Sequence, residues 1–403
     1  MQLQFILTLI AAAGVVSAPV PVAEPAPLLE ARDGTAITGK YIVKMKDGGL
    51  IDTTQIALAL LKKDASQVFN FGKFQGFAAE MSDSVLNVMR RLPSFDYVER
   101  DAVFQASWVN EDVDVDVEKR AAVTQNTAPW GLGRISNVNP GNSSYTYDNS
   151  AGANTCSYII DTGIYTAHPD FEGRAMFLAN FADDGSNSDG NGHGTHVAGT
   201  VGSKTYGVAK KTKLYAIKVL SDSGAGSISG VMAGIAFATN DAKSRGCAKG
   251  AVANLSLAGS KSAVLNTAVA RAVAAGLFVA VGAGNAGTDA SNTSPASEAT
   301  AFTAGATDSS DNFASFSNYG SVVDGLAPGV LILSTSNTGG TQVKSGTSMA
   351  TPHVAGLAAY LLSLEGKMTP SALAARIQAL SQKNKIIGVP SGTNNYLISN
   401  IIQ

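Results

Sequence analysis

Short apolar runs alternate with longer helix-like runs between residues 157 and 379, and this alternation limits the folds that the chain can adopt. The strand-like runs are residues 157–160, 213–220, 251–257, 277–281 and 301–306. The helix-like runs are residues 193–201, 230–243, 262–275, 348–364 and 370–379. Such an alternation is typical of a largely parallel sheet covered by helices on both faces. We therefore expect an α/β fold for this part of the chain.

A serine at the start of one helix-like run has the surroundings of a nucleophile. Gly346 and Thr347 precede Ser348, and small and apolar residues continue to about residue 364. Glycine permits a sharp turn, and the first N–H groups of a helix have no intrahelical partner, so an oxyanion formed there would be stabilised. Serines before helices are most often simple caps. The choice between these two roles depends on partners elsewhere in the chain.

A serine hydroxyl needs a base, and the chain contains four histidines. His168 precedes a proline in a predicted turn, and His353 lies within the serine's own helix, so neither is placed to act as that base. His193 and His196 lie in a glycine-rich approach to another helix. Spacing alone favours neither of these two.

The third group of such a site is a carboxylate that orients the base. Asp161 follows an apolar run at residues 158–160 and precedes Thr162 and Gly163, which is the pattern of a buried strand that ends in a turn. Ligands of α/β sheets bind at the carboxyl ends of the strands. Asp161 is therefore the candidate for the orienting carboxylate.

Three segments together resemble the signature segments of the subtilase family of serine proteases: residues 157–163, 191–196 and 346–352. The order Asp, His, Ser is also that of subtilisin. Further likeness to the proteinase K-like branch lies at residues 128–132, 254–257, 294–298 and 315–320, and the resemblance covers residues 121–403. It implies a subtilisin-like fold and a secreted endopeptidase of broad specificity that needs no cofactor for catalysis.

The resemblance implies a role for each residue of the site. Ser348 would be the nucleophile, His193 the general base and Asp161 the group that holds the imidazole in one tautomer. The likeness selects His193 over His196. Asn285 would be the side-chain donor to the oxyanion, although an Asn between glycines is otherwise a common turn residue.

The resemblance also implies two strands that flank the substrate and bind its backbone as an added strand. The matching residues are Gly224, Ala225 and Gly226 in one strand, and Ser256, Leu257, Ala258 and Gly259 in the other. Ala258 stands where proteinase K has glycine. We expect its methyl group to narrow the primary pocket.

Asp324 matches the carboxylate of a structural calcium site in the family. The other protein ligands implied by the resemblance are the backbone carbonyl groups of Ala299 and Ala301. One carboxylate is a weak calcium signature, and a solvated turn aspartate is the alternative.

The N-terminal part of the chain has the pattern of a precursor. An apolar run at residues 5–16 is too short to span a bilayer and is followed by small residues, so residues 1–18 are predicted to be a signal peptide. Residues 36–106, with helix-like runs at 54–61 and 85–92, have the β-α-β-β-α-β order of a ferredoxin-like α+β domain.

The family resemblance implies that this small domain is an inhibitor propeptide that also assists folding. The predicted propeptide spans residues 19–120 and ends in an acidic linker, 107–120, before the mature peptidase, 121–403. Lys119-Arg120 suits a separate dibasic protease, whereas the family favours self-cleavage, so both routes to Ala121 stay open. An accessory domain that remains attached is the alternative.

Secretion bears on the cysteines and on the glycosylation motifs. Cys156 and Cys247 are an even number in a chain with a signal peptide, which favours a disulfide, and the resemblance implies that they pair. Asn142 and Asn292 begin glycosylation motifs in polar loops and are predicted sites. The motif at Asn254 lies on a predicted buried strand, so we expect it to be bare.

The composition restricts the partners. With 45% hydrophobic and 15% charged residues the chain should be globular, and a net charge of −2 gives no reason to expect nucleic acid or a membrane surface. We expect a monomer that acts on proteins and peptides and binds its own propeptide. Two other functions are possible: a zinc hydrolase that uses His193, His196 and a nearby carboxylate such as Asp189 or Asp161, or a non-catalytic binding protein on a protease scaffold.

Overall fold

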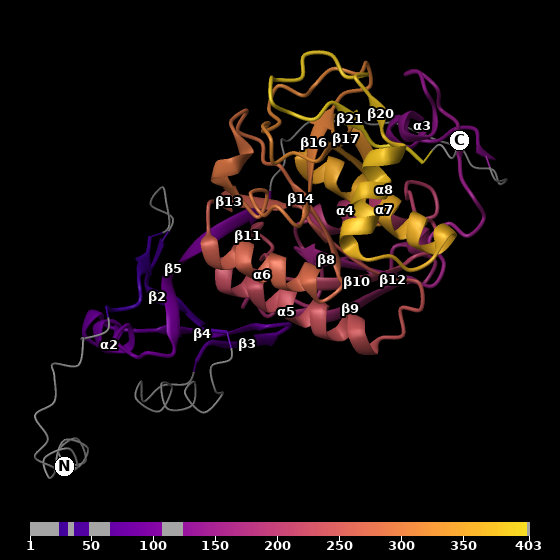
Figure 1. Ribbon diagram of the computed structural model, residues 1–403. Helices are drawn as coiled ribbons and strands as arrows, with labels where there is room; N and C mark the ends of the chain where they lie inside the picture. The colour runs from indigo at the N-terminus through magenta and orange to yellow at the C-terminus, as the bar shows by residue number, and fades with distance from the viewer. Residues whose placement is uncertain (1–23, 31–35, 48–64, 107–123, 401–403) are drawn as a thin grey trace, which may run out of the picture.

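The computed structural model describes residues 24–30, 36–47, 65–106 and 124–400. The predicted signal peptide, the predicted helix at 54–61, the acidic linker and the maturation site at Ala121 lie outside these ranges. In the described part, a small N-terminal body lies against a larger one (Figure 1).

The larger body is built on one sheet whose strands are β8 (Thr155–Asp161), β9 (Ala175–Asn180), β10 (Lys213–Lys218), β12 (Gly250–Leu255), β14 (Phe278–Gly282), β16 (Phe302–Thr307), β17 (Gly325–Pro328), β20 (Gln382–Lys383) and β21 (Tyr396–Leu397). Their order in the sheet is β20-β21-β17-β16-β14-β12-β8-β10-β9. Neighbours from β9 to β21 are parallel, and β20 is antiparallel to β21. The predicted parallel α/β sheet is confirmed.

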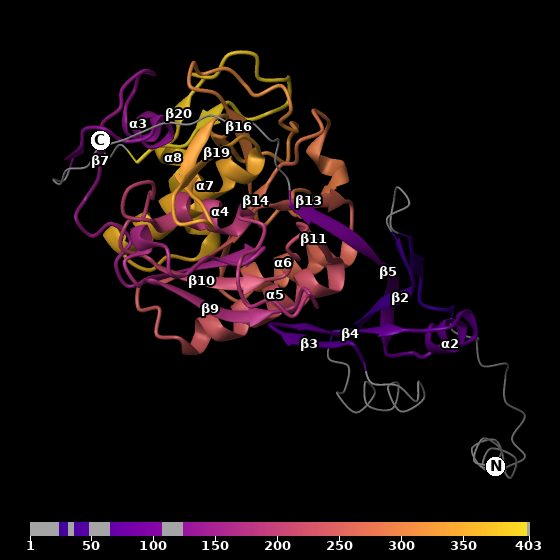
Figure 2. The same cartoon turned by 180° about the vertical axis from the view of Figure 1, so that it is seen from behind.

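Helices cover both faces of this sheet (Figures 1 and 2). One layer contains α4 (His193–Gly202), α7 (Thr347–Glu365) and α8 (Pro370–Leu380), and the other contains α5 (Ile228–Ser244) and α6 (Ala263–Ala274). Successive side chains of a strand point to opposite faces. Ile159 accordingly packs with the first layer, whereas Tyr158 and Ile160 pack with the second. Burial on both faces explains why β8 reads as a continuous apolar run.

Shorter elements surround the sheet. They are α3 (Trp130–Ser136), β6 (Thr124–Gln125), β7 (Tyr145–Thr146), η2 (Pro169–Phe171), η3 (Ala290–Asn292), β15 (Thr293–Ser294), β18 (Ile332–Thr335) and β19 (Thr341–Lys344). β18 and β19 form an antiparallel hairpin that leads directly into α7. The hairpin therefore helps to fix where that helix begins.

The small body contains β1 (Leu28–Leu29), β2 (Ala36–Met45), β3 (Gln67–Phe71), β4 (Phe74–Glu80), α2 (Asp83–Met89) and β5 (Phe95–Ala106). Its sheet order β5-β2-β4-β3, with antiparallel neighbours, is that of a ferredoxin-like domain. Gly72, with a φ of 55°, turns the chain between β3 and β4.

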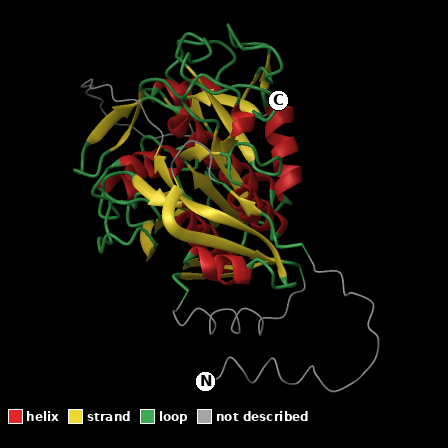
Figure 3. Ribbon diagram, turned by 90° about the vertical axis from the view of Figure 1, so that its left-hand side faces the viewer, coloured by secondary structure: helices red, strands yellow, loops and turns green. Residues whose placement is uncertain are grey.

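β5 leaves its own sheet and enters the larger body, where it pairs antiparallel with β11 (Ala225–Ser227) and β13 (Leu257–Ser260). Figure 2 labels these three strands, and in Figure 3 the small body faces the viewer. Two buried carboxylates of β5 accept hydrogen bonds at helix N-termini. Glu99 Oε2 accepts from Val264 N at 2.9 Å in α6, and Asp101 Oδ2 accepts from Ser229 Oγ at 2.5 Å in α5. Burial raises the pKa of both carboxyl groups.

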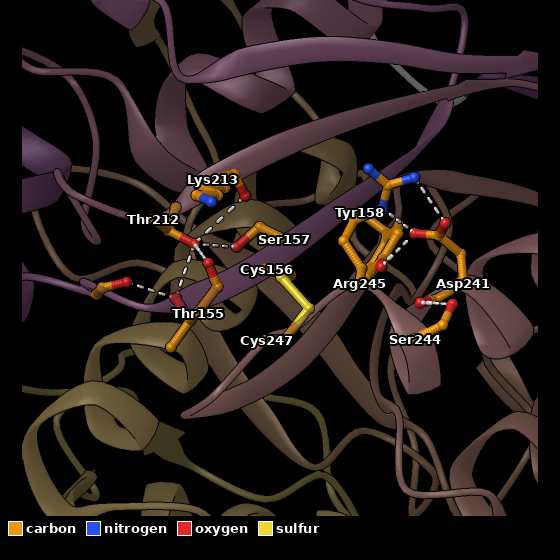
Figure 4. The surroundings of a disulfide bond; sticks show 11 residues. Thr155, Cys156, Ser157, Tyr158, Thr212, Lys213, Asp241, Ser244, Arg245 and Cys247 are labelled. Atoms are coloured by element: carbon orange, nitrogen blue, oxygen red, sulfur yellow. Dashed lines mark hydrogen bonds and ion pairs between the residues drawn. A yellow bond between two sulfur atoms is a disulfide. The ribbon is translucent and has the colours of Figure 1, made fainter.

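The predicted disulfide is present between Cys156, on β8, and Cys247, just after α5, with an S–S distance of 2.01 Å (Figure 4). Beside it, the hydroxyl of Tyr158 donates to Asp241 Oδ2 at 2.7 Å, and Arg245 forms an ion pair with the same carboxylate. The bridge and this network fasten the end of α5 to the sheet. None of the helices in the described ranges has the length and apolar character needed to cross a bilayer.

Candidate active site

Asp161 and His193 meet at the carboxyl end of the sheet. Asp161 is the last residue of β8, and α4 begins at His193, after a left-handed Gly192 with a φ of 91°. His193 Nδ1 lies 2.7 Å from Asp161 Oδ1, and both side chains are fully buried. Because an ionised carboxylate only accepts hydrogen bonds, this contact places the imidazole proton on Nδ1.

Ser348 lies in the first turn of α7, which packs against α4. Its hydroxyl donates to the carbonyl oxygen of Ser256 at 3.1 Å, and the Ser256 hydroxyl donates back to the Ser348 carbonyl at 2.8 Å. These reciprocal bonds fasten the serine to the junction between β12 and β13. Two neighbouring helices thus carry His193 and Ser348 in their first turns.

The loop after β14 places Asn285 beside the same helix start. Its Oδ1 accepts from both the backbone nitrogen and the hydroxyl of Thr347, each at 2.8 Å. Its Nδ2 is buried and has no hydrogen-bond partner among the described residues. A buried amide donor without a partner is costly, so it is suited to an oxygen that is present only during a reaction.

The two predicted substrate-flanking strands lie on either side of one strand. Gln105 of β5 pairs with Ala225 of β11 and with Ala258 of β13. The Gly224 carbonyl accepts from Ala106 N at 2.9 Å. A Cβ on Gly259 would lie 2.6 Å from the Phe104 ring, so a glycine is needed there for that contact. The narrowing effect of the Ala258 methyl group stays a prediction.

Comparison with known proteins assigns the family. The model of the subtilase family, Peptidase_S8, matches residues 156–395. The chain belongs to the subtilase family. It is 50% identical over 403 residues to the cuticle-degrading protease of Metarhizium anisopliae, covering 99% of this chain and all of that one. It is 58% identical over 290 residues to proteinase T of Parengyodontium album, covering 72% of this chain and 98% of that one.

A solved structure agrees with this assignment. A cold-adapted subtilisin-like serine proteinase superimposes with a TM-score of 0.65 at 42% identity, covering 69% of this chain and all of that one. The protein is therefore a serine endopeptidase with a subtilisin-like fold.

The zinc alternative is not supported for this subtilase, because His196 is engaged elsewhere. Its Nε2 lies 2.9 Å from the Ile332 carbonyl and 3.0 Å from the Gln342 carbonyl, on the two strands of the β18–β19 hairpin. Burial lowers its pKa to about 3, so the ring is neutral and Nε2 donates. Within the described ranges no group of three His, Cys, Asp or Glu side chains is placed to hold a metal ion. His196 joins α4 to the hairpin that precedes Ser348.

Asp189, which the zinc alternative offered beside Asp161 as a possible ligand, is engaged by other groups. Its buried carboxylate accepts from Thr162 Oγ1, from Gly192 N and from both the backbone and the hydroxyl of Thr195, at 2.6–2.8 Å. It therefore joins the turn after Asp161 to the start of α4. An aspartate near glycines and threonines carries no sequence signal that distinguishes this role from a turn.

Asp324 lies between β16 and β17 with little compensation for its charge. Its Oδ2 accepts from Thr303 N at 2.8 Å, and burial raises its pKa to about 6. Ala301 is buried just before Thr303, and Ala299 is exposed. A buried carboxylate that lacks a cationic partner fits the chemistry of a cation site, and oxygen ligands suit calcium.

Proposed function

We propose that Ser348, His193 and Asp161 form the catalytic triad of this subtilase. The 2.7 Å contact between two fully buried residues, Asp161 and His193, carries the assignment. With its proton on Nδ1, the imidazole offers the lone pair of Nε2 to the serine hydroxyl. For attack, the hydroxyl that donates to Ser256 must turn toward His193. Asp161 then stabilises the imidazolium, which returns the proton to the leaving amine.

Asn285 Nδ2 and the backbone N–H of Ser348 would bind the developing oxyanion. The Asn285 amide is held in one orientation because its Oδ1 already accepts two bonds from Thr347. The donor side is thereby directed away from Thr347 before substrate arrives. Such preorganised donors lower the barrier because they need no rearrangement during the reaction.

Substrate backbone would be bound as a strand between β11 and β13. Support comes from β5, which already adopts that arrangement against Ala225, Gly226, Leu257 and Ala258. Recognition through backbone groups favours broad specificity for protein and peptide substrates.

Residues 36–106 would act as an inhibitor propeptide, because β5 occupies the edges that a substrate needs. We place the signal peptide at residues 1–18, the propeptide at 19–120 and the mature monomeric enzyme at 121–403, released outside the cell. A Ser348→Ala precursor that accumulates uncut would support self-processing. A precursor cut before Ala121 would identify a second protease.

Two further features belong to the proposed mature enzyme. Asp324 with the carbonyl groups of Ala299 and Ala301 would hold a stabilising calcium ion. Asn142 and Asn292, which are both exposed, would carry glycan. Asn254 is 1% exposed and donates to Ser256 Oγ at 2.9 Å, which supports leaving it bare.

The triad proposal is tested by single and double substitution in the purified mature enzyme. Ser348→Ala should remove hydrolysis beyond a small residue, and a serine-directed phosphonylating reagent should label Ser348 alone. His193→Ala should be nearly as severe and the double variant scarcely worse, because triad residues act as a unit. Multiplicative losses, or inhibition by a chelator with no labelling, would contradict the assignment.

A further inference from the structure

An ion cluster around a buried lysine lies where β10 leads into the loop before β11. Lys218, the last residue of β10, is fully buried. Its Nζ donates to Asp222 Oδ1 at 2.8 Å and to the Leu220 carbonyl at 2.9 Å, and lies 3.1 Å from Asp184 Oδ2. Asp222 belongs to the loop, whereas Asp184 follows β9.

The same ammonium group contacts the turn behind the proposed catalytic carboxylate. Lys218 Nζ donates to the Thr162 carbonyl at 2.9 Å, and Thr162 N donates to Asp161 Oδ1 at 2.7 Å. Lys218 and Asp161 are also neighbours in the register of β10 and β8. The position of Lys218 is thus linked through one residue to the oxygen that holds His193.

Asp222 reaches the approach to His193 from the other side. Its Oδ1 accepts from Gly190 N and its carbonyl accepts from Asn191 Nδ2, both at 3.1 Å. Asn191 Oδ1 in turn accepts from His193 N at 3.2 Å. A Cβ on Gly190 would lie 2.3 Å from Asp222 Oδ2, so this close approach requires glycine.

The far end of the loop is the edge at which β5 binds. Ser221 N donates to the Ala225 carbonyl and Gly224 N to the Ser221 carbonyl, both at 2.8 Å, so the loop is tightly closed. Gly224 then accepts from Ala106 N. One short loop therefore has three contacts: with β5, which pairs with β11; with the turn after Asp161; and with the residues before His193.

We propose that Lys218 and Asp222 are positioning residues that couple occupation of β11 to the alignment of Asp161 with His193. A substrate long enough to pair with β11 fixes the loop, and the loop fixes both members of the pair. Short substrates, which reach only the serine, do not fix the loop and so do not improve the alignment of Asp161 with His193. The inference depends on the proposed triad.

The charge pattern directs the choice of variant. Removing Lys218 would leave two buried carbonyl groups and two carboxylates without their donor, which can prevent folding. Asp222 is about half exposed, at 46%, and can be replaced with less risk. Asp184 is the matched control, because it pairs with the same ammonium group but is not in the loop before β11.

The experiment compares Asp222→Ala and Asp184→Ala with the wild-type mature enzyme. Each is assayed on an N-acetyl amino-acid ester, which cannot reach β11, and on a five-residue peptide anilide, which can. Asp222→Ala removes a charged hydrogen bond from the loop. The free energy of such a bond corresponds to a change of about tenfold in rate, so we expect the ratio of long-substrate to short-substrate kcat/KM to fall about tenfold. Asp184→Ala should leave the ratio within about twofold. The melting temperature and active-site titration verify folding, and Asp222→Asn provides a second, milder variant.

The outcomes separate this inference from the triad itself. Equal losses on both substrates in Asp222→Ala, an unchanged ratio in both Asp222 variants, or an equal fall of the ratio in Asp184→Ala would overturn the coupling. None of these results affects the triad, which is judged by Ser348→Ala and by labelling of Ser348.

Discussion

The side-chain oxygen of Asn285 lies 2.8 Å from both the backbone nitrogen and the hydroxyl of Thr347, the residue that precedes Ser348. This contact ties the loop after β14 to the start of α7 and fixes which end of the amide faces Thr347. The Nδ2 end of the Asn285 amide is then free to donate to a substrate oxygen without any rearrangement.

Loss of the Asn285 amide should therefore affect the transition state more than substrate binding. We expect Asn285→Ala to lower kcat by roughly 100-fold to 1,000-fold with little change in KM, the loss seen when one oxyanion donor is removed. Asn285→Asp keeps an acceptor for Thr347 but removes the donors, so it should be similarly impaired. A higher KM with unchanged kcat would mean that Asn285 binds the ground state instead.

The carboxylates that β5 places at two helix N-termini predict that the affinity of the propeptide for the enzyme depends on pH. Burial raises the pKa of Glu99 and Asp101, so the complex holds protons that the free propeptide releases. The contribution to affinity is complete below the free pKa of about 4 and is lost as pH rises through the raised values. The inhibition constant of the propeptide should increase from pH 4.5 to 7.5.

The control is a propeptide with Glu99→Gln and Asp101→Asn, measured against the same enzyme. Its inhibition constant should vary less with pH, because these groups no longer titrate. Parallel profiles for the two propeptides would assign the pH dependence to other groups.

Asp324 predicts that the stability of the enzyme responds to pH in opposite directions with and without calcium. Without metal, its pKa of about 6 means that its stabilising contribution is complete below about 4 and is lost as pH rises through about 6. Calcium binds the ionised form, so the difference in melting temperature between calcium and chelator should grow through the same range. Asp324→Asn should remove the difference. A chelator effect that persists in this variant would place the metal elsewhere.

The sequence predicted the parallel sheet because strands buried on both faces leave apolar runs, as at residues 158–160 in β8. It also predicted that Asp161 ends a strand, since the turn that follows has a clear pattern. It could not separate His193 from His196, which differ only in partners: a carboxylate for one and two hairpin carbonyl groups for the other. The family resemblance made that choice.

Other contacts were beyond the sequence because they join distant segments through common residue types. Asp189 and Lys218 have ordinary neighbours in the sequence, and both contact a residue far from them in the chain: Asp189 accepts from the Thr162 hydroxyl, and Lys218 donates to the Thr162 carbonyl. Gly190 is one of many glycines, and only the nearby Asp222 carboxylate distinguishes it. Backbone donors and acceptors leave no pattern of side-chain types.

The disulfide predicts a measurable part of the mature enzyme's stability. Cys156 and Cys247 are 91 residues apart. Closing a loop of that length lowers the entropy of the unfolded chain, which stabilises the folded enzyme by about 4.5 kcal/mol in the chain-entropy model. Cys156→Ala with Cys247→Ala should therefore lower the denaturant midpoint and shorten the half-life at elevated temperature, while kcat of the folded enzyme stays close to wild type. Tyr158→Phe is the matched control, because it removes the neighbouring 2.7 Å bond to Asp241 and leaves the bridge intact. A loss in that control equal to the loss in the double variant would attribute the stability to the network beside the bridge. Two reactive thiols in the native enzyme would show that the bridge does not form.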